Sequence, residues 1–194
     1  MNQTKTRMLT EGAIMVALAF ILSFLKIVNF PWGGSITILS MLPIVVFSLR
    51  YGAKYSFAVS FIYSLLQLAQ GIVIDGIFAW GLTPMTLIAV IFLDYLLPFT
   101  LLGAAGFFSN GKFTTVIAGT IASVMLRFVC HYLSGVFIWK TVGEVLGIST
   151  ASPYLYSLLY NGAYMIPELI FTGIGAVILF KTPQVRKLLG LTEK

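Results

Sequence analysis

Four ionisable residues lie inside apolar stretches of the sequence that are long enough to cross a membrane: Asp94, Arg127, His131 and Glu168. Charged groups are costly in hydrocarbon, and those retained there usually face the interior of a protein or a water-filled cavity. A carboxylate, a guanidinium and an imidazole placed in this way can bind a polar or cationic ligand. The sequence therefore predicts a buried polar site.

The run from Arg127 to Trp139 carries the clearest pattern. Positions four apart share one face of a helix, so Arg127, His131 and Gly135 form a stripe. Ser134 lies beside this stripe, and Trp139 lies one turn further out. The stripe is expected to run from about mid-membrane to the outer surface.

Asp94 and Tyr95 are expected on the preceding span at about the same depth as Arg127. One interpretation is a structural Asp94–Arg127 ion pair, because an unpaired charge at this depth is prohibitive. In the alternative, Asp94 faces an outward-open pocket and Arg127 tunes it from below. The residue types alone leave both open.

The last apolar stretch opens with hydroxyl groups and one carboxamide, including Tyr156 and Asn161. An amide in hydrocarbon needs partners, either on a neighbouring helix or on a ligand. Glu168 lies deeper, directly after Pro167. We expect a structural role for it, in which it accepts a hydrogen bond freed by the proline or contacts a partner subunit.

Aromatic residues gather in the connections expected outside the membrane, among them Trp32 and Trp80. Each one singly could belong to an interfacial aromatic belt, but their clustering near buried polar groups favours a site. Ring faces attract cations and stack on planar rings. With the carboxylate of Asp94 they suit a flat, cationic aromatic molecule, whose heteroatoms could bond to His131 and Asn161.

Composition defines the class of protein. The chain has 194 residues, of which 59% are hydrophobic and 9% charged, and its mean hydropathy is +0.99. A soluble domain of this length could not bury so much apolar surface. The net charge of +6 comes from basic residues spread in ones and twos, which excludes a nucleic-acid-binding patch. We expect a single integral membrane domain, 1–194, embedded in a lipid bilayer.

Windows of about 20 apolar residues predict six transmembrane helices, at 8–27, 36–50, 54–74, 82–108, 113–139 and 154–181. Most Lys and Arg residues then fall on the side that carries both termini. The positive-inside rule places that side in the cytoplasm. The predicted fold class is an all-α, multi-pass protein of the cell membrane with cytoplasmic N and C termini and outer connections at 28–35, 75–82 and 140–153.

Other kinds of chemistry find little support in the sequence. Gly106 to Lys112 has the spacing of a Walker A loop, but Phe113 replaces the hydroxyl residue that binds magnesium and no strand precedes it. His131 and Ser134 lack a nucleophile-elbow sequence. One His and one Cys form no metal motif. We expect no enzymatic activity, no metal and no cofactor.

Five groups of residues carry a resemblance to a known family: Leu9-Thr10-Glu11, Leu42-Pro43-Ile44 with Ser48-Leu49-Arg50, Leu93-Asp94-Tyr95, Arg127 to Trp139, and Tyr156-Ser157 with Asn161-Gly162. Over essentially its whole length the chain resembles the thiamine-specific S-components of energy-coupling factor (ECF) transporters, the ThiT or YuaJ family. The resemblance implies a bacterial six-helix subunit that captures thiamine from outside. Transport would then require a transmembrane coupling subunit and two cytoplasmic ATPase subunits, which use the ATP.

The same resemblance implies which residues bind the substrate: Asp94, Tyr95, Arg127, His131, Trp139, Tyr156 and Asn161, with Trp32 and Trp80 from outer connections. Asp94 would meet the aminopyrimidine side of thiamine with support from Tyr95, and Trp139 would stack on a ring. Some members carry Glu at the acidic position, so a pocket with Asp94 must close by about one methylene or use a water.

The first helix carries two alanines four positions apart, Ala13 and Ala17. Small residues at this spacing allow another helix to approach closely. On the resemblance we assign both to docking of the coupling subunit. The alternative is ordinary packing within the chain.

Three other functions remain open. The nearest is an S-component for another vitamin or for a thiamine precursor, which would not need the intact cationic molecule for tight binding. A small membrane-embedded enzyme would need clustered metal ligands or a nucleophile with its base. An autonomous secondary transporter would be expected to show an internal repeat or a pair of discontinuous helices. The sequence shows neither the metal ligands or nucleophile–base pair of the enzyme nor the repeat or discontinuous helices of the secondary transporter.

Overall fold

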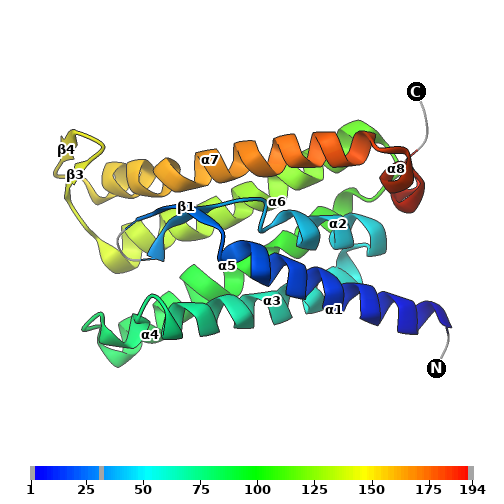
Figure 1. The fold of residues 1–194 in the computed structure, drawn as a ribbon. Helices are drawn as coiled ribbons and strands as arrows, with labels where there is room; N and C mark the ends of the chain where they lie inside the picture. The colour runs from blue at the N-terminus through cyan, green and yellow to red at the C-terminus, as the bar shows by residue number, and fades with distance from the viewer. Residues whose placement is uncertain (1–2, 31–32, 192–194) are drawn as a thin grey trace.

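The computed structural model describes residues 3–30 and 33–191, and helices account for most of them. The uninterrupted α-helices are α1 (Gln3–Ser23), α2 (Leu42–Tyr51), α3 (Ala53–Val73), α7 (Pro153–Lys181) and α8 (Pro183–Leu189). One further span joins α4 (Pro84–Val90), η3 (Ile91–Leu96), α5 (Leu97–Thr100) and η4 (Leu101–Phe108), and another joins α6 (Phe113–Ser134) to η5 (Gly135–Trp139). The long helices run roughly along a common axis as a bundle (Figure 1).

Two small β-hairpins interrupt the helical fold. β1 (Lys26–Asn29) pairs antiparallel with β2 (Ser35–Thr37), and β3 (Gly143–Val145) pairs with β4 (Ile148–Thr150). The short helix η2 (Ile77–Ala79) lies in another connection. The chain is mostly helical, as predicted, and the hairpins lie in connections between helices, where backbone groups outside helices still need hydrogen-bond partners and find them across a hairpin.

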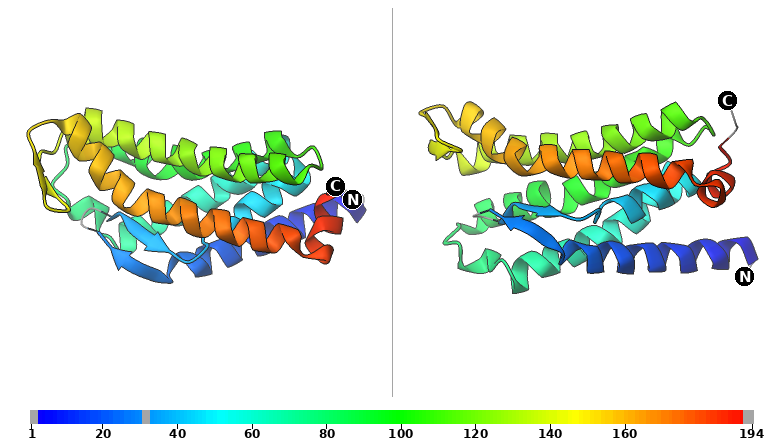
Figure 2. Two further views of the ribbon diagram at one scale, coloured as in Figure 1. Left: turned by 90° about the horizontal axis from the view of Figure 1, so that it is seen from above. Right: turned by 45° about the horizontal axis from the view of Figure 1, so that its top comes forward.

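Five helical segments among the described residues are long and apolar enough to cross a membrane: Lys5–Ser23, Ala53–Val73, Pro84–Phe108, Phe113–Trp139 and Pro153–Lys181. They match five of the predicted spans closely. The span predicted at 36–50 was wrong in length, because its first residues belong to β2 and α2 has only 10 residues. Both termini lie at the same end of the bundle (Figure 2).

Two of the spans contain π-helical turns at places that matter for the site. In η3 the N–H of Leu97 donates to the carbonyl of Phe92, five residues earlier. Pro98 follows, and a proline has no N–H for the carbonyl of Asp94 and crowds it, which favours a local widening of the helix. In η5 the N–H of Lys140 likewise donates to the carbonyl of Gly135 at 2.9 Å.

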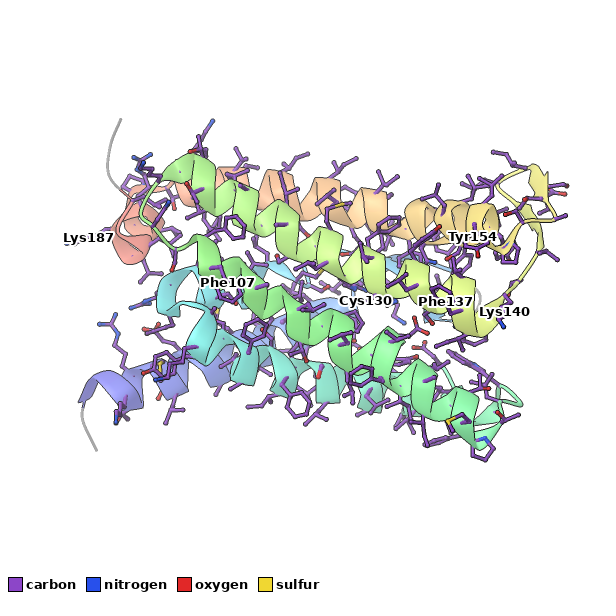
Figure 3. The ribbon with its side chains drawn as sticks, turned by 180° about the vertical axis from the view of Figure 1, so that it is seen from behind. Phe107, Cys130, Phe137, Lys140, Tyr154 and Lys187 are labelled. Atoms are coloured by element: carbon purple, nitrogen blue, oxygen red, sulfur yellow. The ribbon has the colours of Figure 1, made fainter. Side chains whose placement is uncertain are left out.

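The bundle has an apolar exterior and an interior with many small polar side chains. Large apolar residues point outward along the spans; Phe107 is 71% exposed and Phe137 is 61% exposed (Figure 3). Several buried hydroxyls donate to a carbonyl of their own helix, such as Ser48 to Ile44 at 2.8 Å and Thr120 to Val116 at 2.9 Å. Small polar residues between helices and apolar residues outside are typical of membrane bundles.

Charged residues form a cluster at the end of the bundle that carries the termini. Figure 3 shows Lys187 at the end that carries the termini, and Lys140 and Tyr154 at the opposite end. At the termini end, Glu11 of α1 accepts hydrogen bonds from Arg7 Nε at 2.9 Å and from the Tyr51 hydroxyl at 2.7 Å, and it pairs with Arg50 at 2.5 Å. This cluster ties α1 to α2.

Candidate ligand-binding pocket

A pocket opens between the helices, and the residues singled out by the sequence line it. Those that the structure describes are Trp80, Asp94, Tyr95, Arg127, His131, Trp139, Tyr156 and Asn161. They come from η3, α6, η5, α7 and the connection after η2. Trp32 lies outside the described residues. The predicted site residues therefore converge on one cavity.

Three side chains contact the carboxylate of Asp94 in this cavity. Its Oδ2 accepts hydrogen bonds from Ser134 Oγ at 2.5 Å and from Trp139 Nε1 at 3.2 Å. Its Oδ1 lies 3.1 Å from Nδ1 of His131. The side chain keeps 17% exposure, so the carboxylate is held rigidly by three neighbours and still faces the cavity.

Arg127 bonds to His131 rather than to Asp94. Its Nε donates to Nε2 of His131 at 3.3 Å, and its Nη1 lies 3.1 Å from the sulfur of Met41. The guanidinium carbon lies 4.4 Å from the centre of the Phe99 ring, a cation–π distance. The structure therefore disfavours a direct Asp94–Arg127 pair and inserts the imidazole between the two charges.

Aromatic rings form the side walls of the pocket. Trp80 and Trp139 meet edge to face with their ring centres 5.6 Å apart, and Tyr156 stacks on Tyr160 at 6.2 Å. The indole N–H of Trp80 donates to the backbone carbonyl of Asp75 at 3.0 Å. Ring faces in this arrangement can take up planar or cationic groups.

Two glycines, Gly71 and Gly33, leave room for the Tyr95 side chain beside the pocket. A Cβ atom added at Gly71 would come within 2.6 Å of the Tyr95 hydroxyl oxygen, and one added at Gly33 would come within 3.5 Å of it. The ring is 8% exposed. Gly71 was not singled out in the sequence, and its role follows only from the close approach of α3 to η3.

Asn161 satisfies its amide within the protein. Its Nδ2 donates to the carbonyl of His131 at 3.2 Å and to the carbonyl of Ser157 at 2.9 Å, and its Oδ1 accepts from the Tyr164 hydroxyl at 2.6 Å. The amide thus joins α7 to α6 next to His131. This geometry favours a positioning role in addition to lining the pocket.

Glu168 lines the pocket, although the sequence did not place it among the ligand-binding residues. It is 1% exposed; the expected structural role is present, but its partner is neither a second subunit nor a group freed by Pro167. Its Oε1 accepts from the backbone N–H of Thr37 at 2.5 Å and from Thr37 Oγ1 at 2.6 Å. Thr37 comes from β2, a strand that the hydropathy pattern did not predict.

The β1–β2 hairpin covers one side of the pocket. Gly34 packs so tightly that an added Cβ atom would lie 3.0 Å from the Tyr164 ring. Lys26 at the start of β1 pairs with Asp75 at 3.4 Å and also lines the pocket. The hairpin is therefore attached to α7 at its inner end and to the segment after α3 at its outer edge.

Ala13 and Ala17 lie on the exposed face of α1, whereas Val16 and Ala19 face the bundle. Packing within the chain is therefore not their role. The exposed face is available to a lipid or to another helix.

The apolar exterior and the polar, aromatic pocket define a membrane protein that binds a small molecule between its helices. Comparison with known proteins then gives the family. Residues 9–187 match the family model described as thiamine transporter protein (Thia_YuaJ), and the chain belongs to this family. It is a family of transport proteins, which confirms both the resemblance and the expectation that the chain is not an enzyme.

Two relatives support this assignment along nearly the whole chain. The chain is 31% identical to the thiamine transporter ThiT of Bacillus subtilis strain 168, over 94% of this chain and 95% of that protein. It superimposes on a solved structure of ThiT from Listeria monocytogenes with a TM-score of 0.71 and 25% identity, over 96% of this chain and 99% of that one.

Proposed function

We propose that this protein is the substrate-binding membrane subunit of an ECF-type vitamin importer that captures thiamine from outside the cell. A transmembrane coupling subunit and two cytoplasmic ATPase subunits would then drive delivery inward, so that the chain itself needs no cofactor. The names of its relatives support thiamine as the ligand. The observation that carries the proposal is the position of Asp94.

Thiamine is a cation with two aromatic rings. The carboxylate of Asp94 lies beside the Trp139 indole, whose ring meets Trp80. A carboxylate complements the positive charge, and the rings provide faces for stacking. Tyr95, Tyr156 and Asn161 line the remaining walls and would complete the contacts with the ligand.

The proposed topology has six crossings with both termini in the cytoplasm. An α2 of 10 residues spans only about 15 Å, half of the hydrocarbon thickness, so the second crossing would combine α2 with the extended segment before it. The common position of the termini at one end of the bundle supports an even number of crossings. The pocket and the hairpins would then face outward.

In the proposed mechanism thiamine enters from the outer face and the β1–β2 connection closes over it. The Lys26–Asp75 pair and the Glu168–Thr37 bonds are suited to hold the closed position. The loaded subunit would then reorient against the coupling subunit, with Ala13 and Ala17 at the contact. Reorientation is powered by the ATPases.

The test is a titration of the detergent-purified protein with thiamine, followed by intrinsic Trp fluorescence and calorimetry. Strong, saturable quenching is expected. The second candidate, a transporter of another vitamin or of a precursor, is tested with the separate aminopyrimidine and thiazole halves. Binding of one half as tight as that of thiamine would favour the second candidate, and no binding of thiamine to folded protein would exclude the first.

A further inference from the structure

Among the described residues, one carboxylate oxygen of Glu168 accepts hydrogen bonds and the other accepts none. Oε1 accepts both hydrogen bonds from Thr37, at 2.5 Å and 2.6 Å. Oε2 has no hydrogen-bond partner among the described residues, although the side chain is only 1% exposed and lines the pocket. A buried carboxylate oxygen without a partner is unfavourable. A ligand group that hydrogen-bonds to this oxygen would therefore bind favourably.

The part of the pocket around Glu168 is rich in hydroxyls and amides. Thr37 Oγ1 lies 2.6 Å from Ser40 Oγ, and Gln67 Nε2 donates to the Tyr63 hydroxyl at 2.5 Å. This lining suits a small polar group rather than an aromatic ring.

The two indole rings among the described lining residues lie at another part of the pocket, beside Asp94. Trp139 donates to the Asp94 carboxylate, and Trp80 contacts Trp139. Thiamine consists of an aminopyrimidine ring and a thiazolium ring, and the thiazolium carries a hydroxyethyl chain. If the rings occupy the aromatic part, the hydroxyethyl chain is the one polar group left to reach the part with hydroxyls and amides.

We infer that Glu168 is a specificity-determining residue that accepts a hydrogen bond from the hydroxyethyl group of thiamine through Oε2. This inference rests on the proposed function, since it assumes thiamine as the ligand. Glu168 has two tasks in this arrangement: Oε1 holds β2 in place, and Oε2 recognises the alcohol. A hydrogen bond to a carboxylate is stronger than one between neutral groups, so the alcohol is recognised selectively.

The test compares thiamine with an analogue in which the hydroxyethyl chain is replaced by ethyl, each titrated into wild-type protein and Glu168→Gln. Glutamine keeps Oε1 as an acceptor for Thr37 and replaces only Oε2. The analogue is expected to bind wild-type protein about tenfold or more weakly than thiamine, and this ratio is expected to fall to about threefold or less in Glu168→Gln.

Thr37→Val is the matched control. It removes the hydroxyl that bonds to Oε1 and leaves Oε2 unchanged. It is expected to weaken binding of both compounds by the same factor, so that their ratio stays at the wild-type value.

Equal binding of the two compounds to wild-type protein, with thiamine bound tightly, would overturn the assignment and leave the proposed function standing; this result depends on no variant. An unchanged ratio in folded Glu168→Gln would overturn it as well. If wild-type protein binds neither compound, the proposed function fails and the inference fails with it.

Discussion

Nδ1 of His131 lies 3.1 Å from Oδ1 of Asp94. The contact made by the second ring nitrogen identifies which of the two nitrogens carries the proton. Nε2 of His131 accepts a hydrogen bond from Arg127 Nε at 3.3 Å, so Nε2 is unprotonated. The network therefore assigns a neutral imidazole that donates from Nδ1 to Asp94. His131 transmits the position of Arg127 to the carboxylate without a direct ion pair.

Replacement of Asp94 by Asn should weaken thiamine binding by about 100-fold. The amide can still accept from His131, but it loses the negative charge, and its NH₂ group faces the indole N–H of Trp139, which can only donate. Calorimetry on detergent-purified protein measures the affinity. Glu144→Gln, on the exposed hairpin strand β3, is the matched control and should bind normally. Wild-type affinity in folded Asp94→Asn would contradict the assignment of Asp94 to the ligand.

His131→Asn and His131→Gln separate the two bonds of the imidazole. An Asn amide reaches about as far as Nδ1 and can donate to Asp94, whereas a Gln amide reaches about as far as Nε2 and can accept from Arg127. If the bond to Asp94 positions the carboxylate for the ligand, Asn should retain about tenfold more thiamine affinity than Gln. Thermal unfolding of both variants reports their stability. The reverse order of affinities would assign the greater importance to Arg127.

Gly135→Ala should abolish or strongly reduce binding. An added Cβ atom would lie 2.8 Å from the Ser157 Cβ and 3.3 Å from the Asn161 amide nitrogen, which forces η5 away from α7 and displaces Trp139. Such overpacking typically costs about 1–3 kcal/mol. Gly173→Ala on α7 is the control, because its Cβ would meet no described atom within 4 Å. The measurements are thermal stability and thiamine affinity, and equal behaviour of the two variants would argue against this close approach.

Trp139→Phe should remove much of the fluorescence response to thiamine and also weaken binding by about tenfold, because Phe lacks the N–H that bonds to Asp94. Trp80→Phe should lower the response with a smaller loss of affinity, since its indole N–H bonds to the backbone of Asp75 instead. Fluorescence and calorimetric titrations of the two variants are to be compared side by side. A greater loss of affinity for Trp80→Phe would reverse the roles of the two rings.

Ala13→Trp should abolish thiamine uptake in cells that also produce the coupling and ATPase subunits, while binding by the purified protein stays intact. The bulky ring would keep a partner helix from approaching the exposed face of α1. Ile178→Trp is the control, since Ile178 is 64% exposed on α7. Loss of binding together with uptake would indicate misfolding, and normal uptake would exclude this face as the docking surface.

The class of the protein and most of its pocket could be predicted from the sequence. Membrane insertion depends on the apolar character of stretches of about 20 residues, which is a local property, and five of the helical spans follow from it. Buried ionisable residues are rare enough to be informative one by one. For that reason Asp94, Arg127 and His131 could be singled out before their contacts were known.

Tertiary structure alone decided how these residues are connected. The π-helical turns at η3 and η5 change the helical register near Asp94 and Trp139, which a uniform period of 3.6 residues does not anticipate. The bonds between Thr37 and Glu168 join residues 131 positions apart. The hydropathy of a segment indicates whether lipid or water surrounds it, whereas such contacts depend on which segments pack together. Packing therefore determined the position of Asp94 beside His131 and the place of Glu168 in the pocket.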